Sequence, residues 1–235
     1  MSDAARALPD WGYEPGVHGP KPKGDPRFLA TAGGALVLAI LATRLLGLWG
    51  LVAFVTFSVG LVVLLASDAG RSTLRREKAV RIKPGTSSRA ENIVSGLAPR
   101  AGIEIPQLWR IPSEDANAFV CRTTGPVIAL TSGLIDTYTR TELEAVIAHC
   151  CVRLARTATL LGALRLAVTG VMSGRPPAGG ADDVVAAAVT RYPPALASAI
   201  SKATPRSGRG AAFWFVPDSD GERSAERRSE LLLTL

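Results

Sequence analysis

The feature that most constrains this chain is a 40-residue stretch, 28–67, in which Arg44 is the single charged residue. One straight helix of that length would extend about 60 Å, about twice the hydrocarbon thickness of a bilayer. Two spans of about 20 residues fit better. The reversal would fall at 44–50, where Arg44 reaches the headgroups and Trp49 lies at the interface. We therefore expect an N-terminal two-helix transmembrane hairpin.

The residues that flank 28–67 predict its orientation. Residues 1–27 are rich in Pro and Gly and lack periodicity, which is typical of a disordered tail. The linker 68–85 carries six Lys or Arg against Asp68 and Glu77. The positive-inside rule puts this linker in the cytoplasm, and an even number of spans puts the tail there too. We expect a multi-pass protein of the cytoplasmic (inner) membrane whose N-terminus and C-terminal domain are both cytoplasmic, and the basic linker attracts anionic lipid.

Composition excludes several other classes of protein. The net charge is +7, but no clustered basic patch with a recognised module accompanies it, so we expect no nucleic-acid partner. The three cysteines, Cys121, Cys150 and Cys151, are an odd number, and two of them are adjacent. They therefore do not form a disulfide framework, and a reduced compartment fits them better.

The residues beyond the linker predict an α+β domain over 86–216, mainly helical with a small sheet. Expected strands are 107–111, 117–122, 127–131 and a short one at 211–216, and expected helices are 86–100, 139–154, 182–189 and 195–202. The apolar stretch 157–172 contains Arg165, which favours a core helix over a third membrane segment. The charged segment 217–235 is expected to be a solvated helix.

The helix at 139–154 carries the most informative chemistry. Thr139 and Glu142 form a capping box that sets its start. Apolar residues then recur at spacings of three and four, which predicts one buried stripe. His149 and Arg153 are four apart and share a face.

Zinc peptidases place two histidine ligands and a glutamate base on such a helix, in the pattern HExxH. This chain reads HCCVR at 149–153. His149 keeps one ligand position, Cys150 stands at the general-base position, and Arg153 replaces the second histidine.

Three stretches make the chain similar to the HtpX-like family of membrane zinc metallopeptidases, which are related to the CAAX prenyl proteases. They are AGIEIPQLWRIP with NAFVCR, PVIALTSGLID with TRTELEAVIAH, and ADDVVAAAVTRYPPAL. The resemblance implies a zincin-type domain behind a membrane hairpin. It also implies that Asn117, Ala118 and Phe119 lie on an edge strand beside a peptide groove.

The same resemblance shows where this chain departs from the family. The family's aspartate falls on Asp183, and its glutamate ligand, four residues earlier, falls on Gly179. Of the implied ligands only His149 remains, whereas a catalytic zinc normally takes three. The charge of Arg153 also repels a dication. We therefore expect no bound cofactor, and we assign no catalytic residue.

Other roles for these residues stay open. Cys150 and Cys151, with Cys121, could be soft metal ligands, or Cys150 could pair with His149 as a nucleophile. Adjacent helical side chains diverge, however, so buried packing residues are the simpler interpretation. Asp182 and Asp183 suit a helix N-terminus, and Asp183 is also a candidate ion-pair partner for Arg153.

The sequence thus predicts a membrane-anchored pseudopeptidase that binds or regulates membrane proteins. Peptide would add to the edge strand at 117–122 by main-chain hydrogen bonds. The alternative, which the resemblance alone implies, is an active zinc-dependent metalloendopeptidase in membrane-protein quality control. A third possibility is that the spans and basic linker carry the function and the domain is a spacer.

Overall fold

The structure is a computed structural model that describes residues 26–157, 180–207, 210–218 and 222–235. Three sequence-based expectations fall outside these ranges. They are the tail up to residue 25, the segment 158–172 of the expected core helix, and the ligand position Gly179.

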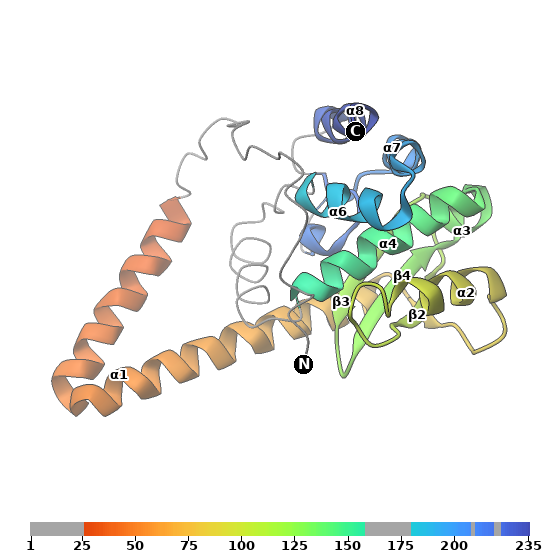
Figure 1. Ribbon diagram of the computed structural model, residues 1–235. Helices are drawn as coiled ribbons and strands as arrows, with labels where there is room; N and C mark the ends of the chain where they lie inside the picture. The colour runs from red at the N-terminus through yellow and green to blue at the C-terminus, as the bar shows by residue number, and fades with distance from the viewer. Residues whose placement is uncertain (1–25, 158–179, 208–209, 219–221) are drawn as a thin grey trace.

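The first element, α1, is a 51-residue helix, Pro26–Arg76, that is broken at Gly47. The backbone of Gly47 has φ 63° and ψ −153°, in a region that glycine adopts readily and other residues rarely do. The break lies inside the reversal predicted at 44–50, and the two arms of α1 meet there at a sharp bend (Figure 1). Among the residues with a described placement, no helical stretch meets the length and apolarity needed to cross a bilayer. The transmembrane hairpin therefore stays a prediction.

A four-stranded sheet has the order β1-β2-β4-β3. Its strands are β1 Val80–Arg81, β2 Gln107–Ile111, β3 Ala118–Arg122 and β4 Pro126–Thr131. The inner pair, β2 and β4, is parallel, and β3 pairs with β4 antiparallel. Every residue of β4 is buried, as expected of an inner strand. The first three predicted strands are confirmed to within one residue, whereas β1 was not predicted.

The helices that follow α1 are α2 Ser88–Leu97, α3 Ser132–Thr137, α4 Arg140–Thr157, α6 Gly180–Thr190, α7 Pro193–Lys202 and α8 Glu222–Leu233, with the 3₁₀ turn η3 at Ala211–Phe213. Of these, α4 contacts the sheet, and α2, α6 and α7 pack on α4 (Figure 1). The predicted α+β class is confirmed. The strand predicted at 211–216 is wrong for its first half, because η3 covers 211–213 and only Trp214 forms a β-bridge, with Phe119.

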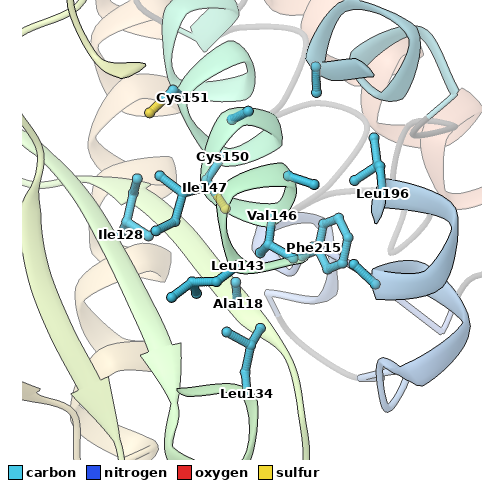
Figure 2. Close-up of a cluster of buried hydrophobic side chains, with 14 of the residues drawn as sticks. Ala118, Ile128, Leu134, Leu143, Val146, Ile147, Cys150, Cys151, Leu196 and Phe215 are labelled. Atoms are coloured by element: carbon cyan, nitrogen blue, oxygen red, sulfur yellow. The ribbon is translucent and has the colours of Figure 1, made fainter. Parts of the chain in front are cut away.

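The central element is α4, which lies between the sheet on one side and α6 and α7 on the other (Figure 1). The prediction of a single apolar stripe is therefore incomplete, because α4 is buried on nearly all faces. From α4, Ile147 points toward Ile128 of β4 and Leu143 toward Ala118 of β3, whereas Val146 points toward Phe215 (Figure 2). Full enclosure explains why His149 and Arg153 are buried although both are polar.

Candidate functional site

The start of α4 is fixed by the predicted capping box. Thr139 donates its backbone N–H to Oε2 of Glu142 at 2.9 Å, and Thr139 Oγ1 accepts from the N–H of Glu142 at 3.3 Å. Ser198 and Lys202 of α7 both donate to Oε1 of Glu142 at 2.6 Å. Burial by itself raises the pKa of Glu142, but these donors outweigh it and lower the pKa to about 2. The capping box thus also docks α7.

His149 lies on the next turns of α4 and is fully buried. Its Nδ1 is 2.9 Å from Oδ1 of Asp183 on α6, which is an ion-pair distance without hydrogen-bond alignment. The imidazole edge meets the Phe215 ring, with the centroids 5.0 Å apart. Its other nitrogen, Nε2, is buried and has no hydrogen-bond partner. The structure therefore brings together His149 and Asp183, two positions that the sequence had singled out.

Asp183 is the centre of this site. Both of its oxygens accept from Arg228 of α8, with Nε–Oδ2 at 2.7 Å and Nη2–Oδ1 at 2.8 Å. Burial opposes ionisation of Asp183, but the guanidinium of Arg228 and the contact with His149 hold its pKa well below the usual range. Among ion pairs between described residues, Asp183 is thus paired with Arg228 and His149. The predicted Arg153–Asp183 pair is wrong.

Arg153 takes a different partner. Its Nη1 donates to the carbonyl oxygen of Trp214 at 2.7 Å, and only 5% of the residue is exposed. Burial lowers the pKa of this guanidinium, an effect that nearby Asp182 opposes and Arg228 reinforces. Asp182 itself lies 2.6 Å from Nη1 of Arg156, nearer the surface. The two acidic residues at the start of α6 therefore serve ion pairs as well as the helix dipole.

The three thiols are unsuited to catalysis or metal binding as they stand. Cys121, Cys150 and Cys151 are free and buried. Burial raises the pKa of Cys121 and Cys151 to about 12 and that of Cys150 further. A thiol with so high a pKa stays protonated near neutral pH, whereas the nucleophile and the metal ligand are both thiolates. This fits their expected role as packing residues.

The three residues expected beside a peptide groove are themselves covered. Asn117, Ala118 and Phe119 have no exposed surface. Phe215 donates its N–H to the carbonyl of Ala118 at 2.7 Å, and Phe119 forms a β-bridge with Trp214. The edge of β3 thus contacts the chain's own residues.

Arg228 is the site residue that the sequence analysis missed. The C-terminal helix was predicted to be solvated, which is wrong for this face, because Arg228 is 8% and Leu232 1% exposed. The usable signal was the spacing of Ala225, Arg228 and Leu232 by three and four, which marks one buried face of a helix.

A catalytic zinc needs three protein ligands and an open coordination position. Across the described parts of the chain, no group of three or more His, Cys, Asp or Glu side chains is placed to hold a metal ion. Asp183 is engaged by Arg228, whereas Nε2 of His149 has no hydrogen-bond partner among the described residues. The undescribed stretch 158–179 contains no His, Cys, Asp or Glu. The described residues around His149 therefore do not fit zinc.

A capped, buried helix that presents His149 over a small mixed sheet is the framework of a zincin-type α+β domain. Sequence comparison agrees: residues 84–151 match peptidase family M48. The chain is 34% identical over 85 residues to "Protease HtpX" of Legionella pneumophila strain Philadelphia 1, covering 35% of this chain and 30% of that protein. It is 39% identical over 85 residues to a "Protease HtpX homolog" of Thermococcus kodakarensis, covering 34% and 28%.

A longer but weaker match, 23% over 148 residues, is to a "Protease HtpX homolog" of Pelotomaculum thermopropionicum, covering 62% of this chain and 53% of that protein. Over residues 84–151 the chain is thus similar to peptidase family M48, and the relatives reported above are HtpX proteases or their homologues. It spans about a third of the length of the first of these relatives.

We predict that Asp183→Asn destabilises the fold by about 3–5 kcal/mol near neutral pH, because Arg228 stays buried without a counter-charge. The pKa of Asp183 is lower in the folded state than the ordinary 3.8, so its stabilisation is complete above that value and lost as the pH falls below it. The stability gap between wild type and variant should therefore be constant from about pH 7 to 5 and shrink below about pH 4.

Denaturant unfolding at each pH measures this gap. The control is Asp136→Asn, which removes an exposed pair: the side chains of Arg110 and Asp136 are 56% and 65% exposed, so its loss should cost less than about 1 kcal/mol. Equal effects of the two variants would contradict the prediction.

Proposed function

We propose that this chain is a membrane-anchored, non-catalytic HtpX-like homologue, a pseudopeptidase that acts in the binding or regulation of membrane proteins. The observation that carries the proposal is the position of Arg153. At the place of the family's second histidine, its buried guanidinium donates to the Trp214 carbonyl. A permanently charged group with a structural partner there is incompatible with a dication a few ångströms away.

Water activation is missing as well. Cys150 occupies the general-base position, and its side chain belongs to the hydrophobic core around α4 (Figure 2). Burial raises the pKa of this thiol far above neutrality, so its thiolate is not available to take a proton from water. No residue is assigned a catalytic role.

The alternative, an active zinc metalloendopeptidase, has one observation in its favour. Nε2 of His149 is buried without a hydrogen-bond partner, and such an atom is typical of a ligand awaiting its metal. The 2.9 Å contact of Nδ1 with Asp183 also resembles the carboxylate contact that orients metal-binding histidines. One imidazole is too few ligands, however, and the remaining positions are Arg153 and Gly179.

The membrane anchor is supported by the surface of α1. Large apolar side chains are exposed on both sides of Gly47, among them Leu38 at 57%, Trp49 at 82% and Phe57 at 70%. Exposed apolar surface of this extent is typical of a membrane or protein interface. A bilayer is the better fit here, because the basic linker next to α1 is attracted to anionic lipid headgroups. We assign the chain to the cytoplasmic membrane, with the domain on the cytoplasmic side.

Partner recognition is assigned to the edge of β3. An edge strand can accept an extended peptide by main-chain hydrogen bonds, which requires no metal. At residues 117–119 this requires that residues 214–215, which pair with them, move away. The partner class is a segment of a membrane protein or a free peptide.

We predict that the purified full-length chain contains no stoichiometric zinc and does not cleave unfolded casein. Elemental analysis and a gel-based cleavage assay measure the two properties, with a zinc peptidase run alongside as the positive control. His149→Ala should change neither result. Stoichiometric zinc that His149→Ala abolishes, or cleavage that a chelator stops, would establish the alternative.

The anchor has its own prediction. The full-length chain should remain in the membrane pellet after alkaline carbonate washing and be released by detergent. The double variant Leu38→Asp, Phe57→Asp should be retained less, because each carboxylate at the centre of a span costs about 2.5–3.5 kcal/mol. Release of the wild-type chain by carbonate alone would refute the anchor.

A further inference from the structure

The residues that cover β3 come from one short segment, 213–216, which follows η3. Because β3 lies at the end of the strand order, one of its sides faces no other strand of the sheet. The 213–216 segment lies along that side: Trp214 pairs antiparallel with Phe119, and the N–H of Phe215 donates to the carbonyl of Ala118. This is the position in which a bound peptide would extend the sheet.

Asn117 fastens the end of the segment. Its Nδ2 donates to the carbonyl of Val216 at 2.9 Å, and its Oδ1 accepts from the N–H of Val216 at 3.2 Å. The same Nδ2 donates to the carbonyl of Thr204 at 2.7 Å. A side-chain amide that hydrogen-bonds both the N–H and the carbonyl of one residue recognises the main chain of that residue, whatever side chain the residue carries.

Two buried arginines bind the carbonyls of two consecutive residues of the segment. Arg153 donates to the carbonyl of Trp214 at 2.7 Å, and Arg228 donates to that of Phe215 at 3.1 Å. Hydrogen bonds from a charged donor are stronger than those between neutral groups. The arginine that stands at a metal-ligand position therefore contacts the main chain of the segment directly.

The side chains of the segment are as well packed as its backbone. Phe213, Trp214, Phe215 and Val216 are each 2–3% exposed. The Phe119 ring contacts the rings of Phe213 and Trp214, with centroids 5.6 and 5.3 Å apart. From the outer side, the guanidinium of Arg206 lies 5.2 Å from the Trp214 ring.

We infer that the 213–216 segment is a resident internal ligand of β3, held in the peptide position by Arg153, Arg228 and Asn117. This deepens the proposed function and rests on it, since β3 is the edge proposed to take a partner. An external peptide and the segment exclude each other. A peptide that displaces the segment must be extended and carry bulky apolar side chains for the space beside Phe119.

Hydrogen exchange of the full-length chain in detergent tests whether Arg153 closes this edge. In wild type, the amide of Phe215 should be protected. Arg153→Met should increase its exchange about tenfold or more, and Arg153→Lys, which keeps a charged donor, should restore part of the protection. The control Arg156→Met, one turn further along α4, should leave it unchanged. Unchanged protection in α2 shows that each variant is folded.

A fluorescently labelled peptide with the sequence of residues 211–218 (AAFWFVPD) tests directly whether an external peptide and the 213–216 segment compete for β3. Arg153→Met should bind it about tenfold more tightly than wild type does, whereas a scrambled peptide binds neither. If Arg153→Met does not fold, Arg206→Met removes the contact with Trp214 instead. It should give the same faster exchange at Phe215 and the same tighter binding of the peptide. Rapid exchange at Phe215 in wild type, or equal peptide binding by wild type and the folded variant, would overturn the inference. Zinc content and cleavage report on the proposed function separately.

Discussion

One buried carboxylate organises this domain. Asp183 joins α6 to α8 through Arg228 and to α4 through His149, and all three side chains are almost fully buried. A buried charge is costly unless it is paired and hydrogen-bonded, so the three helices are held in one arrangement that satisfies it. Two buried arginines, Arg153 and Arg228, then orient the backbone of 213–216 against β3. Among the described residues, this centre is organised by charged side chains and their hydrogen bonds.

Much of this fold was predictable because its signals are local. The capping box at Thr139 and Glu142 and the three main strands depend on residues close in sequence, and the structure confirms them. Spacing within α8 could indicate that Arg228 is buried, but it could not indicate its partner, because Asp183 is 45 residues distant. The partner of Asp183 was wrongly predicted for the same reason: spacing shows which face a side chain occupies, but not which long side chain reaches it.

The segment at 211–216 illustrates a second limit of sequence reasoning. Its apolar pattern predicts a strand, and it does lie along β3, yet η3 takes up its first half and it makes one β-bridge. Side chains from elsewhere, Asn117, Arg153 and Arg228, satisfy its backbone in place of a regular ladder. A buried main chain needs partners, but local sequence does not say whether they are strands or side chains.

We propose that ion pairs take the place of a metal in this domain. The most direct test is thermal unfolding of the full-length chain, measured once with excess zinc and once with a chelator. An ion that binds the folded state raises the unfolding temperature. The account predicts the same unfolding temperature in both conditions. A rise with zinc that His149→Ala abolishes would contradict it.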